Sequence, residues 1–174
     1  MAFLDGADVV VRRLDDERWL LVRPLVYQGN TDTFVVPAGF TTDFASVPRV
    51  AVWLIPRFGK YTPAAILHDW LCGPGILSGL IDPVDVDGIF RRVMRELGVP
   101  TVQRWLMWAG VRWSATTQAH RRFGWWSTAP ATIAISLAAL PVVAPAGVAI
   151  LLGLALYTAV ERVVTGRSGG TLTT

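Results

Sequence analysis

Short runs of apolar residues separated by turn signals occupy the N-terminal part of the chain. The segments 8–14, 18–27 and 33–36 are rich in Val, Leu, Trp, Tyr and Phe, which favour β-strands. Asp15-Asp16 and Gln28-Gly29-Asn30 lie between these segments and read as turns. The pattern predicts three short antiparallel strands in a meander.

After residue 40 the apolar positions recur at helical spacing. Ser46 is suited to cap a short helix, and Pro63 and Pro83 suit first helical turns after Thr62 and Asp82. Glycine and proline residues at 73–75 and 98–100 mark helix ends. We therefore expect helices at about 48–55, 63–71, 83–97 and 101–121. Strands followed by packed helices predict an α+β domain.

Residues 123–160 contain no Asp, Glu, Lys, Arg or His. As one straight helix, this stretch would extend about 57 Å at 1.5 Å per residue, whereas a bilayer core is about 30 Å thick. Pro141 and Pro145 near its middle suggest a break. This predicts a transmembrane helical hairpin, with arms at about 125–140 and 146–163. A single crossing with an interfacial first arm, or a hairpin buried in a soluble oligomer, are the alternatives.

Composition and charge support this division. Apolar residues make up 52% and charged residues 17% of the 174-residue chain, and the apolar excess lies mainly in the uncharged stretch. We expect a domain at 1–122, a membrane segment at 123–164 and a flexible tail at 165–174.

The positive charges suggest an orientation. Arg121 and Arg122 precede the apolar stretch, and Arg162 and Arg167 follow it, which places both ends of a hairpin on the cytoplasmic side. A single cysteine and the absence of a signal-peptide pattern fit a cytoplasmic domain. The lipid bilayer is the expected partner, and nucleic acid is disfavoured because basic residues beside an apolar stretch are typical of membrane flanks.

Candidate chemistry concentrates at His68-Asp69, with Asp43 and Asp87 as further acidic groups. These four residues could hold a divalent metal ion, and their oxygen-rich set favours Mg²⁺, Mn²⁺ or Ca²⁺. Asp43, Ser46, His68 and Asp69 are the candidate catalytic residues, with Ser46 as nucleophile and His68 as base. The alternative is that His68 and Asp69 stabilise the fold, that Ser46 only caps a helix, and that Cys72 is a core thiol.

Two stretches carry a resemblance to a known family. They are Val36-Pro37-Ala38-Gly39-Phe40-Thr41-Thr42-Asp43-Phe44-Ala45-Ser46-Val47-Pro48-Arg49 and Gly59-Lys60-Tyr61-Thr62-Pro63-Ala64-Ala65-Ile66-Leu67-His68-Asp69-Trp70-Leu71. With Val86-Asp87-Gly88-Ile89-Phe90, they resemble a phage and prophage family catalogued as domain of unknown function 1353. The resemblance covers about residues 8–115. It implies a phage or prophage origin and an α+β domain but supplies no activity, and the apolar segment after residue 122 lies outside it.

Three functions are consistent with these patterns. The first is a membrane-anchored phage accessory protein that acts as a binding or assembly module with other phage proteins. The second is a metal-dependent hydrolase that uses Asp43, His68 and Asp69. The third is a holin-like protein whose hairpin self-associates in the membrane through its small residues.

Overall fold

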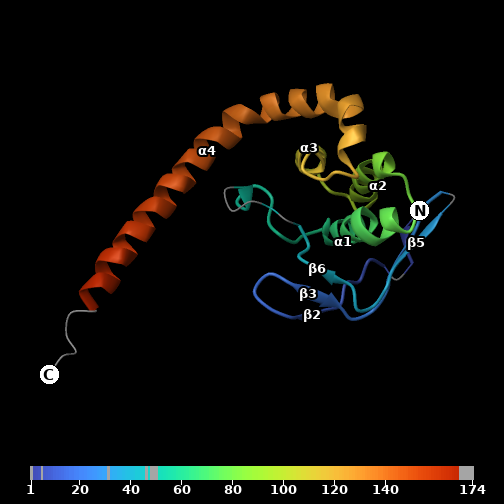
Figure 1. Cartoon of the computed structure of the whole chain (residues 1–174), viewed down its shortest axis with the longest axis horizontal. Helices are drawn as coiled ribbons and strands as arrows, with labels where there is room; N and C mark the ends of the chain where they lie inside the picture. The colour runs from blue at the N-terminus through green and yellow to red at the C-terminus, as the bar shows by residue number, and fades with distance from the viewer. Residues whose placement is uncertain (1, 5, 31, 46, 48–50, 169–174) are drawn as a thin grey trace.

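Short strands precede the helices along the chain, as the sequence predicts. The structure is a computed structural model and describes residues 2–4, 6–30, 32–45, 47 and 51–168 (Figure 1). The strands are β1 (Ala2–Phe3), β2 (Val11–Arg13), β3 (Trp19–Leu21), β4 (Leu25–Gln28), β5 (Thr33–Val36) and β6 (Thr41–Thr42). The helices are α1 (Thr62–Trp70), the π-helix η2 (Leu71–Gly75), α2 (Pro83–Glu96), α3 (Thr101–Ala115), the 3-10 helix η3 (Arg122–Gly124) and α4 (Trp125–Ser168).

The strands form two small antiparallel sheets rather than one meander. One sheet has the order β1-β4-β5 and the other β2-β3-β6. The prediction of a single strand at 18–27 is therefore wrong, because this segment divides into β3 and β4, which belong to different sheets. Pro24 lies between these two strands. Because proline has no backbone N–H group, it cannot donate a hydrogen bond to a neighbouring strand. Thr41 and Thr42, for which the sequence pattern predicts no strand, pair with Leu20 and Trp19 of β3.

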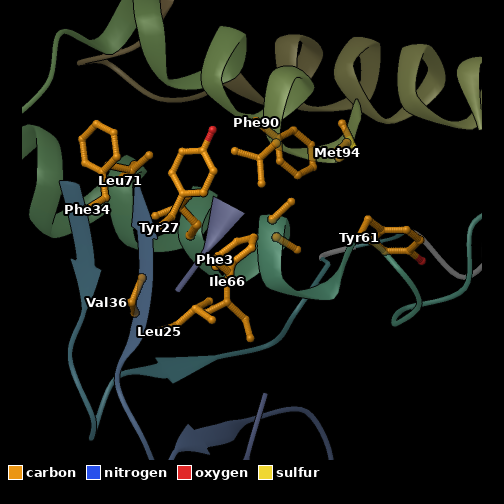
Figure 2. Packing of buried hydrophobic residues seen from close by; sticks show 14 of the residues in the cluster. Phe3, Leu25, Tyr27, Phe34, Val36, Tyr61, Ile66, Leu71, Phe90 and Met94 are labelled. Carbon is orange, nitrogen blue, oxygen red and sulfur yellow. The ribbon is translucent and has the colours of Figure 1, made fainter. Parts of the chain in front are cut away.

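The hydrophobic core lies between the β1-β4-β5 sheet and the helices. Figure 2 shows side chains of β4 and β5 pointing towards residues of α1, η2 and α2. The buried residues that it labels are Phe3, Leu25, Tyr27, Phe34, Val36, Tyr61, Ile66, Leu71, Phe90 and Met94. Tyr27 is 1% exposed, and its hydroxyl donates to Oε2 of Glu96 at 3.0 Å, so the only polar atom of its side chain has a partner.

The first two helical predictions have different outcomes. The predicted helix at 63–71 is confirmed in α1, with Pro63 in its first turn, but it does not stop at residues 73–75. It continues as η2, whose wider turn includes Pro74. Residues 51–55 form turns rather than an α-helix, while Ser46 and residues 48–50 of the same prediction lie outside the described residues.

The next two helices are close to expectation. The prediction at 83–97 is confirmed in α2, where the Asp82 side chain accepts a bond from the Val84 N–H at 2.9 Å and caps the helix. Helix α3 ends at Ala115, six residues before the predicted end at 121. The hydroxyls of Thr116 and Thr117 donate to carbonyls of the last turn, at 2.7 and 2.8 Å, which leads the chain out of the helix.

The predicted helical hairpin is not formed. Helix α4 is continuous over 44 residues, with Pro130, Pro141 and Pro145 inside it. Figure 1 shows α4 passing over α3, changing direction, and then running away from the domain without folding back. Each proline removes one backbone hydrogen bond, which bends a helix without forcing it to reverse. The tail predicted at 165–174 begins inside α4, and residues 169–174 lie outside the described residues.

The two ends of α4 have different surroundings. Its first turns pack on α3: Ala129 and Thr132 are buried, and the indole N–H of Trp113 donates to Ser136 Oγ at 3.0 Å. From residue 151 to residue 166 every position is exposed. The division of the chain at residue 122 stays a prediction, since residues on both sides of it contribute to the same packed region.

Candidate functional site

A network of charged side chains lies where the helices meet. Each of its members comes from a different element: His68 from α1, Asp87 from α2, Arg112 from α3, and Arg121 from the segment before η3. All four are buried, and Asp87 is only 1% exposed. A buried carboxylate is stable only when its charge is compensated, so the network requires these partners.

Asp87 is the centre of this network. Its Oδ2 accepts from Nη1 of Arg112 at 2.7 Å, and its Oδ1 accepts from Nη2 of Arg121. Nε2 of His68 lies 2.7 Å from the same Oδ1. Burial raises the pKa of Asp87, but the hydrogen bond from His68 and the positive charges around it outweigh burial and hold the pKa below its usual value. Asp87 is therefore ionised and can only accept hydrogen bonds.

This assignment fixes the state of His68. Because both oxygens of Asp87 are acceptors, Nε2 of His68 carries the proton and Nδ1 is the unprotonated nitrogen. Burial lowers the pKa of His68, and the charge of Arg121 adds to this, although the hydrogen bond to Asp87 opposes it. His68 is thus neutral near pH 7, and the charge of Asp87 is compensated by Arg112 and Arg121 rather than by His68.

Arg112 extends the network to the N-terminal end of α4. Its Nη2 donates to the Gly124 carbonyl at 2.6 Å, and its Nε donates to the Thr128 hydroxyl at 2.8 Å. One guanidinium group therefore connects Asp87 with η3 and with the first turn of α4. The planar, fork-like geometry of arginine allows these three simultaneous bonds, which lysine could not reproduce.

Cys72 lies beside His68, one helical turn further along. Its Sγ is 3.4 Å from Nε2 and 3.7 Å from Nδ1. Burial raises the pKa of Cys72 to about 12, so the thiol is protonated at neutral pH. A protonated thiol is a poor nucleophile, and the surroundings fit the core-thiol alternative.

Two of the four predicted metal residues, His68 and Asp87, lie together beside Cys72, whereas Asp69 interacts with Asp43 instead. Donor atoms of His68, Cys72 and Asp87 lie within 4.8 Å of one another, close enough to share an ion. However, both oxygens of Asp87 already accept from guanidinium groups, and a divalent cation there would lie beside two buried positive charges. The geometry favours an ion network that holds elements together, while metal binding by Asp43, His68, Asp69 and Asp87 stays a prediction.

Asp69 faces a different partner from its neighbour His68. Its Oδ2 accepts from the Thr42 hydroxyl of β6 at 2.7 Å, and Thr42 Oγ1 in turn accepts from the Phe44 N–H at 2.9 Å. Burial raises the pKa of Asp69 to about 7, and the charge of nearby Asp43 also raises it, against the effect of the Thr42 bond. Phe44, next to Asp43, has a φ of 64°, an unusual value for a bulky residue.

Of the predicted catalytic residues, the structure brings Asp43 and Asp69 together and turns His68 away from Asp69 towards Asp87. Ser46, and Arg49 from the family signature, lie outside the described residues. The sequence pattern did not predict Arg112 or Arg121 as site residues, and Arg121 was expected only to flank the membrane segment. One signal was available for Arg112: it follows Ala109 by three positions and Trp105 by seven, on the apolar side of α3.

A comparison with protein families matches the larger part of this domain. The family model described as "Protein of unknown function (DUF1353)" matches residues 19–111, more than half of the chain. The chain belongs to this family. The DUF1353 match includes Asp43, His68, Asp69 and Asp87, and it ends one residue before Arg112, so α4 and the two buried arginines lie beyond it. No curated protein matches the chain, and no solved structure does.

Proposed function

We propose that this DUF1353 protein is a membrane-anchored binding or assembly module whose α4 crosses a bilayer once. The observation that carries the proposal is the apolar part of α4. Within the segment Trp125–Gly166, a stretch of 18 residues has a mean hydropathy of 2.3, and none of this stretch is buried against the rest of the chain. In a soluble domain, the rest of the protein would cover the apolar surface of a core helix. A large apolar surface that stays exposed marks a site of interaction with a membrane or another protein.

The position of the bilayer follows from the aromatic residues. Trp113 donates its indole N–H to Ser136, and Tyr157, which is 66% exposed, lies further along α4. Ser136 and Tyr157 are 21 positions apart, which corresponds to about 32 Å of helix at 1.5 Å per residue. That length fits a hydrocarbon core of about 30 Å. Trp and Tyr favour the two interfaces, so these residues are suited to flank the crossing.

A single crossing leaves the first turns of α4 in contact with the domain. Residues 125–136 pack on α3, and Glu161 and Arg162 follow the apolar stretch on the other side. Most of the lysine and arginine residues precede residue 123, which favours a cytoplasmic domain. The network around Asp87 and Arg112 would then hold the domain in a fixed orientation at the membrane surface, as an assembly module requires. The phage or prophage context implied by the family signature is part of this proposal.

Fractionation tests the anchor. The full chain is expressed in bacterial cells, and membranes are collected by high-speed centrifugation and washed with alkaline carbonate. We expect the chain to stay in the pellet. The matched variant Leu151→Arg/Leu154→Arg places two charges in the apolar stretch, each at a cost of about 2.5–3.5 kcal/mol, and should be released. A wild-type chain recovered as a folded soluble oligomer would overturn the anchor and support the soluble-oligomer alternative.

Hydrolysis is the second candidate function, and one observation favours it. Burial raises the pKa of Asp69 to about 7, and a carboxyl group whose pKa is raised towards neutrality is suited to general acid–base chemistry. If this is correct, Asp69→Asn should abolish turnover of a hydrolysable substrate without unfolding the protein. Equal activity of the two proteins against every substrate that the wild type cleaves would exclude Asp69 from catalysis.

A further inference from the structure

The loop that leads into α1 carries two large aromatic side chains on the surface of the domain. This 51–60 loop comprises residues 51–60, of which Trp53 is 45% exposed and Phe58 is 67% exposed. Single exposed apolar residues are ordinary, but exposed apolar residues that occur together mark a site of interaction. Trp53 and Phe58 are five positions apart in one short loop, so their exposure requires an explanation.

Hydrogen bonds and packing give the loop a defined shape. The N–H groups of Leu54 and Ile55 both donate to the Ala51 carbonyl, at 3.0 and 2.9 Å. Ile55 packs against the hydrophobic core, while the ring of Phe58 meets the ring of buried Phe44 edge to face, with 6.4 Å between centroids. The loop therefore has its own anchors in the domain, and the exposed part of Phe58 is a feature of the folded state.

The end of the loop is joined to α1 by reciprocal hydrogen bonds. The Gly59 N–H donates to Thr62 Oγ1 at 2.8 Å, and the Thr62 N–H donates to the Gly59 carbonyl at 2.9 Å. Because α1 is part of the core, these bonds fix the direction in which the loop leaves the domain. A contact made by the loop would thus orient the whole domain.

The charge of the loop is entirely positive. Arg57 and Lys60 are its only charged residues, and the sequence from 51 to 68 contains no Asp or Glu. Aromatic rings favour the membrane interface, and nearby cations are attracted to anionic lipid headgroups. Interfaces between proteins are depleted in lysine. The composition of the loop therefore favours a lipid surface over a protein partner.

The loop also lies on a suitable side of the domain. Figure 1 shows residues 51–55, in teal, extending from the domain on the side where α4 runs away from it. If α4 crosses a bilayer, it keeps the domain close to the membrane surface. A loop on this side would then be within reach of the headgroups.

We propose that the 51–60 loop is a second membrane contact, separate from α4. Trp53 and Phe58 enter the interfacial layer of the bilayer, and Arg57 and Lys60 contact anionic headgroups. The inference rests on the membrane location proposed above and adds that the domain lies against the bilayer instead of being held only by α4. Two contacts far apart in the sequence give the domain one orientation at the surface.

Fluorescent labels in proteoliposomes test this contact. The full chain with Pro56→Cys, at an exposed position of the loop, is labelled with the dye NBD in vesicles of phosphatidylcholine and phosphatidylglycerol. The quencher is a lipid with a nitroxide in its headgroup, and the wild type, with only Cys72, gives the background. We expect a blue-shifted emission that loses about half of its intensity or more to the quencher. The matched control is Leu77→Cys, at a position that is 84% exposed, which should lose less than about a tenth.

A label in α4 separates failure of this contact from failure of the crossing. With Leu151→Cys, a nitroxide in the lipid acyl chains should quench the dye if α4 is inserted. Quenching of that label without quenching at Pro56→Cys would overturn the second contact, leave the loop to a protein partner and retain the crossing. Quenching at Pro56→Cys alone would support the loop contact and contradict the crossing. No quenching at either position, or equal quenching at Leu77→Cys, would overturn the contact.

Two variants in the Pro56→Cys chain assign the contact to these side chains. Phe58→Ser should reduce the headgroup quenching about twofold or more, whereas the matched control Leu80→Ser, at another exposed leucine, should not. Arg57→Gln/Lys60→Gln should remove the dependence of quenching on phosphatidylglycerol. If Phe58→Ser does not fold because it loses the contact with Phe44, the charge variant decides. Wild-type quenching in every variant that folds would overturn the proposal.

Discussion

Nη1 of Arg112 lies 2.7 Å from Oδ2 of Asp87, and both side chains are almost completely buried. The same guanidinium group also donates to Gly124 and Thr128, so this ion pair joins the DUF1353 domain to the helix that follows it. The stability of the domain and the position of α4 therefore depend on the same residues.

Replacing Asp87 by Asn should strongly destabilise the protein. It would leave Arg112 and Arg121 as uncompensated buried charges, and breaking such a pair costs about 3–5 kcal/mol. Urea unfolding of the full chain in mild detergent measures the free energy. Asp16→Asn, at a highly exposed carboxylate, is the matched control and should change little. A loss below about 1 kcal/mol in Asp87→Asn would contradict the structural role of the network.

A double-mutant cycle isolates the pair itself. Arg112→Met removes the guanidinium while keeping an apolar stem of similar length. If Arg112 and Asp87 interact as the structure shows, the double variant should lose less than the sum of the two single losses, by about 0.5–3 kcal/mol. Additive losses would mean that the two side chains act independently.

His68 should make stability dependent on pH. Its folded-state pKa is lowered, so the unfolded chain binds a proton more readily once the pH falls below the ordinary value of about 6.5. The contribution of neutral His68 is complete above that pH and is lost as the pH falls towards the folded-state pKa. His68→Gln keeps a donor for Asp87 but does not titrate. We expect the melting temperature of the wild type to fall more than that of His68→Gln between about pH 7 and pH 5, and parallel curves would refute this.

Asp69 should have the opposite pH dependence. Its pKa is raised from 3.8 to about 7, so the folded state holds the proton in that interval and stability is lost as the pH rises through it. Asp69→Asn can still accept from Thr42 but carries no charge. The difference in melting temperature between Asp69→Asn and the wild type should therefore become more positive from pH 5 to pH 8. A constant difference would mean that burial does not raise this pKa.

The close approach of Gly124 to Val84 predicts a steric effect. A Cβ atom at Gly124 would lie 2.7 Å from Cγ2 of Val84, so Gly124→Ala should destabilise the protein by about 1–3 kcal/mol. Val84→Ala in the same chain should restore most of the loss. Gly110→Ala is the control, because its Cβ meets nothing within 4 Å and alanine favours the helix. Urea unfolding of these variants decides whether η3 packs on α2 as described.

Local signals predicted much of the fold because they act over a few residues. Asp82 followed by Pro83 marked the start of α2, and the apolar stripe through Val86, Phe90 and Val93 marked its buried side. The two sheets were not predictable in this way, since pairing of Trp19 with Thr42 depends on long-range contacts. The continuous course of α4 was not predictable from local signals, because two prolines within an apolar stretch favour a break, whereas α4 contains Pro141 and Pro145 inside the helix.

The candidate site was predicted only in part for a similar reason. Sequence order placed His68 beside Asp69, but consecutive residues of a helix point in different directions, and the two side chains join separate groups. Arg112 and Arg121, which donate to Asp87, are 25 and 34 positions from it along the chain, and no local spacing indicates these contacts.

The continuous helix also predicts how the prolines can be changed. In a hairpin, Pro141→Ala/Pro145→Ala would remove the turn and alter the topology. In α4 the two alanines restore backbone hydrogen bonds, and each replaces a residue that costs about 3 kcal/mol in a helix interior. We expect the double variant to reach the membrane fraction as fully as the wild type and to melt at an equal or higher temperature. Loss of membrane association in this variant would contradict the single-helix account.

The most direct test of the single crossing is the accessibility of its two sides. Glu17→Cys on the domain and Thr171→Cys after α4 are labelled separately in spheroplasts with a membrane-impermeant maleimide, before and after permeabilisation, and the wild type with only Cys72 gives the background. If α4 crosses the membrane once, Thr171→Cys reacts before permeabilisation and Glu17→Cys only afterwards. If both positions react only after permeabilisation, the ends lie on the same side, and the single crossing of α4 is contradicted.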